Sequence, residues 1–137
     1  MIKSFTNLEV WKTGHELVIR IYKTTNSFPK AEQFGLTSQM KRSAASVTAN
    51  IAEGFGRKNS KEKEQFYLIS AGSLLELKDQ LLIARDVGYM KRADFENVAE
   101  LSNKCHAQLN ALLRTHRSIR NSKFQILNSK GSFNASR

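Results

Sequence analysis

The side chains best suited to chemistry in this chain are three histidines and one cysteine. His15, His106 and His116 stand apart, and none follows a glutamate at the Glu-x-x-His spacing by which helical bundles hold two iron ions. Cys105 shares its expected helix face with apolar residues and with no histidine or aspartate, which indicates a core residue rather than a nucleophile. The sequence therefore predicts no catalytic residue, no metal site and no cofactor, and we expect a protein that is not an enzyme.

Charge is the strongest signal in the composition. The chain has 22 Lys and Arg against 12 Asp and Glu, a net charge of +10. Such an excess attracts polyanions, with nucleic acid first and an anionic membrane or an acidic protein second, although charge can also serve solubility alone. A single cysteine, no signal peptide and no apolar run of about 18 residues lead us to expect a cytoplasmic protein without a membrane partner.

Two basic clusters that are distant in the sequence are expected to meet. One flanks a predicted turn and consists of Arg57, Lys58, Lys61 and Lys63, and the other ends the last predicted helix and consists of Arg114, Arg117, Arg120 and Lys123. No acidic residue occurs from Leu101 onward. Antiparallel helices with short connections bring both clusters to one end, the basic pole, which we predict to bind phosphate groups. Basic residues also complement helix C-termini, but that effect does not account for Lys61 and Lys63.

The elements that position these residues are four helices. Apolar residues spaced by three and four predict a helix over about 7–25, with a capping box at Thr6 and Glu9, and Phe28-Pro29 ends it. Further helices are expected over about 36–56, 60–87 and 92–119. The fold class is therefore all-α, an up-down-up-down four-helix bundle within residues 1–120. Residues 121–137 are expected to form a basic, flexible C-terminal tail.

The third predicted helix has an unusual pattern. Between Phe66 and Val87 its apolar residues lie on every side of the helix. A four-helix bundle of 137 residues cannot cover such a helix completely. We therefore expect the chain to associate with copies of itself.

Polar residues form a second stripe on the predicted helix over 36–56. The expected structural polar network consists of Gln39, Arg42, Asn50, Glu53 and Glu76. If the hairpin turns near Lys58, residues facing each other have numbers that add up to about 116. We therefore predict an ion pair between Arg42 and Glu76 inside the bundle, which would set the register more than it would add stability. The same register places Ser46 near Ser70.

Distinctive motifs follow one another between about residues 5 and 90. They are Phe5-x-x-Leu8-x-Val10-Trp11, Ile21-Tyr22-x-x-Thr25-x-x-Phe28-Pro29, Phe34-Gly35-Leu36-x-x-Gln39-x-x-Arg42, Asn50-Ile51-Ala52-Glu53-Gly54-x-Gly56-Arg57, Gly72-Ser73-x-x-Glu76-Leu77 and Gly88-Tyr89. Together they resemble the family of small bacterial four-helix-bundle proteins named after open reading frames in 23S rRNA intervening sequences. One departure is Ala71, where the family often has arginine, so no role of that arginine carries over.

The resemblance implies more about assembly than about activity. Relatives are ring-shaped homopentamers, and a similar bundle occurs in accessory variability proteins of diversity-generating retroelements, which bind nucleic acid and a reverse transcriptase through a basic surface. It implies a non-enzymatic homo-oligomer, with a pentamer expected.

Two functional hypotheses follow. In the first, the ring binds the phosphate backbone of nucleic acid, RNA rather than DNA, through the basic pole. In the alternative, the protein is an interaction scaffold whose basic surface binds an acidic protein partner such as a reverse transcriptase. Binding of nucleic acid by nuclease-treated protein distinguishes the two.

Overall fold

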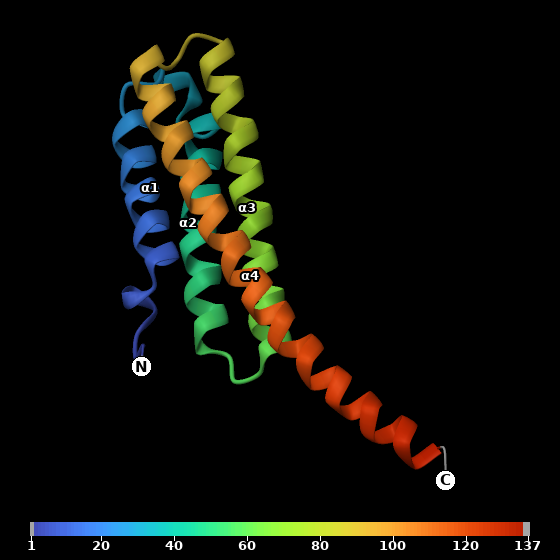
Figure 1. The fold of residues 1–137 in the computed structure, drawn as a ribbon. Helices are drawn as coiled ribbons and strands as arrows, with labels where there is room; N and C mark the ends of the chain where they lie inside the picture. The colour runs from blue at the N-terminus through green and yellow to red at the C-terminus, as the bar shows by residue number, and fades with distance from the viewer. Residues whose placement is uncertain (1, 136–137) are drawn as a thin grey trace.

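Four α-helices pack side by side in the computed structural model, which describes residues 2–135 (Figure 1). They are α1 (Glu9–Thr25), α2 (Leu36–Gly56), α3 (Ser60–Asp86) and α4 (Arg92–Ala135), with short 3-10 turns η1 (Phe5–Asn7) and η2 (Lys30–Glu32). Among the described residues, no helix combines the length and the apolar character needed to cross a membrane. The predicted all-α four-helix bundle is confirmed.

The helices alternate in direction along the chain. Figure 1 shows the α2–α3 turn at one end of the bundle and the α1–α2 and α3–α4 connections at the other. α1 packs against α2 and α4, and α3 packs against the same two helices. Each helix therefore has two neighbours and one outer face.

Three of the four predicted helices have nearly the observed bounds. α2 agrees with the prediction, and α3 ends one residue earlier than expected. α1 begins at Glu9 because η1 precedes it, and there the Ser4 hydroxyl accepts a hydrogen bond from the Thr6 amide at 3.2 Å. The predicted capping box at Thr6 and Glu9 is therefore wrong, since Leu8 is the N-cap of α1.

The fourth helix is longer than predicted. Instead of ending near residue 119 it continues to Ala135 and projects beyond the bundle (Figure 1). Once a helix is formed, each further residue adds a hydrogen bond, and the only proline of the chain is Pro29. The separate tail predicted from residue 121 is therefore helical through Ala135. Residues 136–137 lie outside the described part, and flexibility of the segment stays a prediction.

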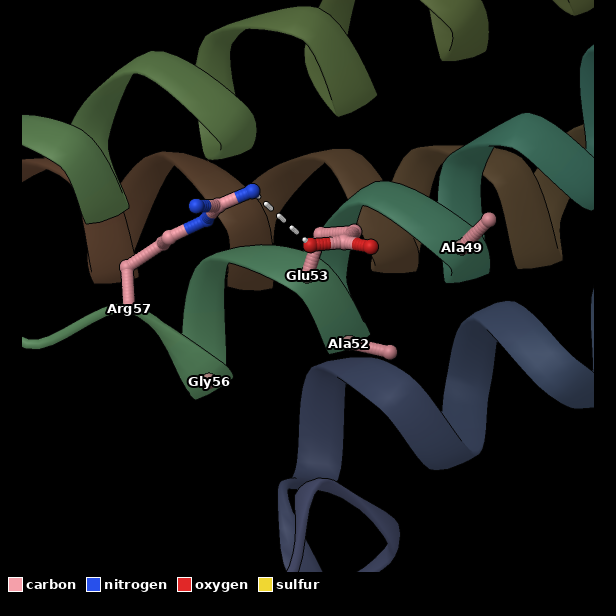
Figure 2. Close-up of a pocket in the computed structure, with 5 residues that line it drawn as sticks. All are labelled: Ala49, Ala52, Glu53, Gly56 and Arg57. Atoms are coloured by element: carbon pink, nitrogen blue, oxygen red, sulfur yellow. Dashed lines mark hydrogen bonds and ion pairs between the residues drawn. The ribbon is translucent and has the colours of Figure 1, made fainter.

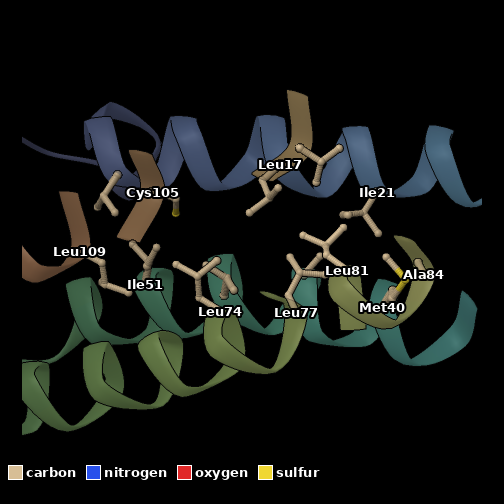
Figure 3. Close-up of a cluster of buried hydrophobic side chains, with 14 of the residues drawn as sticks. Leu17, Ile21, Met40, Ile51, Leu74, Leu77, Leu81, Ala84, Cys105 and Leu109 are labelled. Atoms are coloured by element: carbon tan, nitrogen blue, oxygen red, sulfur yellow. The ribbon is translucent and has the colours of Figure 1, made fainter. Parts of the chain in front are cut away.

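The core runs along the axis of the bundle. Leu17, Ile21, Met40, Leu74 and Leu109 are fully buried and interdigitate from all four helices (Figure 3). Full burial of an aliphatic side chain of this size stabilises the fold by about 1.5–3 kcal/mol. Val98, Cys105 and Leu109 of α4 supply one side of this core.

Two hydroxyl contacts set the height of α3 against α2. The Ser70 hydroxyl donates to the Val47 carbonyl at 2.7 Å, and the Ser46 and Ser73 hydroxyl oxygens lie 2.7 Å apart. The residue numbers of these pairs add up to 117 and 119, against the predicted value of about 116. Ser46 therefore faces Ser73 rather than Ser70, a shift of less than one helical turn.

The predicted ion pair inside the bundle is absent. Arg42 and Glu76 are both exposed, and no ion pair joins them in the described part of the chain. Gln39 is also exposed, Glu53 pairs with Arg57 at 3.3 Å, and all four side chains therefore lie on the outside of the α2–α3 pair. Water solvates these charges better than a buried pairing would.

Asn50 is the half-buried member of the predicted polar network. Its side-chain amide donates to the Ser46 carbonyl at 2.8 Å and lies 3.1 Å from the Ser46 hydroxyl. Of the five predicted residues, Asn50 alone is linked to the hydroxyl contacts between α2 and α3.

Two glycines at the end of α2 differ in their surroundings and give a matched test of this packing. A Cβ atom on Gly54 would lie 2.6 Å from Cε1 of the buried Tyr67 ring, whereas one on Gly56 would meet nothing within 4 Å. We expect Gly54→Ala to lower the free energy of unfolding by about 1–3 kcal/mol through overpacking. Gly56→Ala should leave it equal or slightly higher. Urea unfolding measures both, and equal stabilities would contradict the close α2–α3 contact.

Candidate nucleic-acid interface

The two basic clusters lie at the same end of the bundle. The α2–α3 turn and the part of α4 that leaves the bundle are neighbours in Figure 1. A direct contact joins them, because the Arg117 Nε–H donates to the carboxylate of Glu64, in the first turns of α3, at 3.4 Å. The structure therefore places the α2–α3 turn and the segment of α4 around Arg117 at the same end of the bundle.

Four of these cations are exposed and have no ion pair within the described residues. They are Lys58, Lys61, Arg114 and Lys123. The side chain of Arg120 lies outside what the structure describes. Exposed ammonium and guanidinium groups that form no ion pair are the groups that can contact phosphate.

Lys63 has a structural role at this end, and the expectation that the complementing of a helix C-terminus does not account for it is wrong. Its ammonium group donates to the Phe55 carbonyl at 2.7 Å and to the Gly54 carbonyl at 3.3 Å, and it lies 5.5 Å from the centre of the Phe55 ring. Burial lowers the pKa of Lys63. Its positive charge thus satisfies the last carbonyls of α2, where cations stabilise a helix.

Arg57 and Arg117 are partly engaged. Arg57 donates to Glu53 at 3.3 Å, the contact drawn in Figure 2, and its guanidinium lies 4.6 Å from the centre of the Phe66 ring. Arg117 rests on Glu64, whose side chain is only 7% exposed. Since a guanidinium has five N–H donors, each arginine keeps donors that can face a ligand.

His116 lies beneath the basic pole. Its ring is tilted against Tyr67 with centroids 5.4 Å apart, and its Nδ1 atom is buried without a hydrogen-bond partner. Burial and the charge of Lys63 lower the pKa of His116, while Glu64 opposes them. Burial raises the pKa of Tyr67 to about 12. Glu64 and His116 were not predicted at the basic pole, although Glu64 precedes Tyr67 by three residues and so shares its helix face.

A second histidine links α3 to α4 inside the bundle. The Lys78 ammonium donates to Nδ1 of His106 at 2.7 Å, a contact that requires a neutral imidazole. Burial and the neighbouring Lys78 charge lower the pKa of His106. Next to it, Cys105 is fully buried, and burial raises the pKa of its thiol to about 11. The described residues include no group of three His, Cys, Asp or Glu that could hold a metal ion.

A shallow groove of about 510 Å³ lies on the outer face of α2 (Figure 2). Ala49, Ala52 and Gly56 form its floor, and Glu53 and Arg57 form one side.

The fold places this chain among the small four-helix-bundle proteins. Comparison with known proteins shows to which family within this class it belongs. Residues 6–111 match the family model described as 23S rRNA-intervening sequence protein. The chain is a member of this family, as the motifs predicted. The motifs end at Tyr89, before α4 begins, whereas the match continues about twenty residues further and includes the first half of α4.

A solved structure supports the fold. It is the crystal structure of a protein with unknown function from the S23 ribosomal protein family of Bacteroides thetaiotaomicron VPI-5482, with a TM-score of 0.69 and 21% sequence identity. The similarity covers 76% of this chain and 97% of that chain. At this identity it shows the fold alone. No curated protein matches the chain.

The position of Lys63 leads to a prediction about stability. Lys63→Met keeps the length of the side chain but removes the donor to the last carbonyls of α2, so the free energy of unfolding should fall by about 1 kcal/mol. Lys61→Met, two residues away and exposed, should change it by less than about 0.5 kcal/mol. Chemical denaturation compares the two variants. Equal effects would contradict the capping role of Lys63.

The two half-buried imidazoles, His106 and His116, predict a pH dependence. Folding lowers the pKa of His106 and of His116, so protonation favours the unfolded chain. Their contribution to stability is present above the unfolded histidine pKa of about 6.5 and is lost as the pH falls through the lower folded values. Thermal unfolding between pH 7.5 and 5 should show this decline, and His106→Gln combined with His116→Gln should reduce it. An unchanged decline in the double variant would exclude these histidines as its source.

Proposed function

We propose that this protein is a non-enzymatic, nucleic-acid-binding homo-oligomer that contacts the phosphate backbone through its basic pole. The observation that carries the proposal is a group of exposed cations on two neighbouring elements that form no ion pair within the part of the chain that the structure describes. They are Lys58 and Lys61 beside the α2–α3 turn and Arg114 and Lys123 on α4. Each of these cations can contact a phosphate without breaking an ion pair with a carboxylate.

The opposite end of the bundle differs in its balance of charge. It also carries basic residues, but acidic neighbours neutralise several of them: Arg85 pairs with Asp86 at 2.7 Å, and Arg92 pairs with Glu96 at 2.9 Å. The basic pole also holds two ion pairs, Arg57 with Glu53 and Arg117 with Glu64, but α4 has no acidic residue from Leu101 onward that could offset Arg114 and Lys123. The excess positive charge of the chain is therefore greatest where we propose that nucleic acid binds.

Assembly would strengthen this surface. α3 exposes six large apolar side chains along its length, and monomeric proteins rarely leave such a surface open. These residues are Leu68, Ile69, Leu75, Leu82, Ile83 and, at the end of the helix, Val87. We infer a ring-shaped homo-oligomer, with five copies proposed, of about 78 kDa (five chains of 15.5 kDa). Several basic poles on one ring bind a polyanion more tightly than one pole does.

RNA is the first ligand to consider. The family takes its name from an intervening sequence of 23S rRNA, which sets an RNA context. Contacts to phosphate position a nucleic acid without reading its sequence. We therefore expect low sequence specificity and a steep dependence of affinity on salt.

Charge-matched variants test the site. Lys58→Ala, Lys61→Ala and Arg114→Ala together remove three exposed cations from the basic pole. The control is Lys23→Ala, Lys30→Ala and Lys91→Ala, which removes three exposed cations at the opposite end. Fluorescence anisotropy with a short duplex RNA at several salt concentrations gives the slope of log K against log salt. The first triple variant should lower this slope by about 2–3 units, and the control should leave it nearly unchanged.

Two results would contradict the proposal. Equal losses in both triple variants would mean that net charge, rather than the basic pole, attracts RNA. If nuclease-treated protein binds neither RNA nor DNA at any salt concentration, the result would favour the alternative hypothesis. In that hypothesis the basic surface binds an acidic protein partner such as a reverse transcriptase.

A further inference from the structure

The outer face of α3 carries a row of exposed apolar side chains that have no partner within the described part of the protomer. Leu68, Ile69 and Leu75 are 47%, 53% and 54% exposed, and exposed apolar residues continue to the end of the helix. Because the face extends lengthwise, a partner that covers it must run nearly along α3. A second helix bundle of the same length meets this requirement.

Gly72 lies in the middle of this face. A Cβ atom there would meet nothing within 4 Å, and Gly88 is the only described glycine with positive φ, so neither space nor backbone conformation requires glycine at position 72. Glycine inside a helix costs about 1 kcal/mol relative to alanine. Nothing in the protomer offsets this cost. The space left by the absent side chain would let a helix of another chain approach the α3 backbone closely.

The outer face of α2 has the complementary shape. Its groove is shallow and has the small residues Ala49 and Ala52 on its floor (Figure 2), whereas α3 presents large apolar side chains. α2 and α3 are neighbours in the bundle, so their outer faces point in directions roughly at right angles. Two different faces arranged in this way make a head-to-tail contact that closes a small ring.

The outer faces of α2 and α3 also carry charges of opposite sign. Arg42 is exposed on α2, and Glu76 and Asp79 are exposed on α3, and the described residues give none of the three an ion pair. Copies of a chain with net charge +10 repel one another unless the surfaces that meet have opposite signs. A basic group above the groove of α2 and acidic groups on the face of α3 provide this match.

Symmetry then fixes which residues meet. Rotation about a ring axis parallel to the bundle keeps every residue at its own height along that axis. The hydroxyl contacts between α2 and α3 show which residues share a height, namely those whose numbers add up to between 117 and 119. Arg42 is thus level with Glu76, and Ala49 is level with Ile69. The same pairs would be level between neighbouring copies.

We propose that the outer face of α3 in one copy packs into the groove on the outer face of α2 in the next, with Gly72 at the point of closest approach and Arg42 of one copy paired with Glu76 of the other. This inference rests on the ring assembly proposed above and specifies its interface. The ion pair that the sequence suggested within one bundle would then join two bundles.

Two single variants and their mixture test the contact. Ala49→Trp fills the groove of α2 and leaves the α3 face intact, whereas Gly72→Arg blocks the α3 face and leaves the groove intact. Both positions are exposed, so the helices should stay folded by circular dichroism. Light scattering should give 15.5 kDa for each variant alone and about 31 kDa, two chains, for an equimolar mixture. Asn110→Trp, on an exposed position of α4, is the control and should retain the mass of the wild type.

Each outcome has one meaning. A 31 kDa mixture of two monomeric variants supports a head-to-tail contact, because one intact groove and one intact face allow only one pairing. A wild-type mass for Ala49→Trp, or a mixture that stays at 15.5 kDa, would overturn the interface while leaving a ring in place. A wild-type protein that is itself monomeric would overturn the ring, and the interface with it. Binding of RNA is measured separately, so its failure would not be confused with either result.

Discussion

The packing of α3 against α2 is the contact on which the other features depend. The hydrogen bond from Ser70 to the Val47 carbonyl fixes the height of the two helices, and the bare surface of Gly54 lets the Tyr67 ring approach α2 closely. With this register the α2–α3 turn lies beside α4, where Glu64 contacts Arg117. The same register determines which residues on the outer faces of the two helices are level. One helix pair thus organises the core, the basic pole and the proposed ring.

The basic pole illustrates how a folded protein divides its charges between stability and binding. Lys63 closes α2, and Glu64 and an aromatic ring hold Arg117 and Arg57, respectively, so these cations help to build the end of the bundle. Lys58 and Lys61 need no such contacts and remain in solvent. Counting basic residues in the sequence therefore overestimates the number that can meet a phosphate. A surface with fewer free cations per copy gains more from assembly into a ring.

The bounds of α2 and α3, the end of α1 and the core could be predicted because apolar periodicity and Phe28-Pro29 are local signals. The end of α4 could not, since a polar helix without proline has no stop signal in its composition. The Arg42–Glu76 pair was predicted inside the bundle, but both side chains are exposed. Register can be estimated by counting from a turn, whereas the direction of a side chain relative to the core depends on small rotations of the helix. The roles of Lys63 and His116 depend on contacts between helices, which no local pattern records.

The central claim is that a ring of these bundles binds nucleic acid through its phosphates. Light scattering of the nuclease-treated wild-type protein, alone and with a short duplex RNA at low and at high salt, tests it most directly. The account predicts a particle of about 78 kDa, five chains of 15.5 kDa, that takes up RNA at low salt and releases it at high salt. A particle of any size whose mass does not change with RNA at either salt concentration would contradict it.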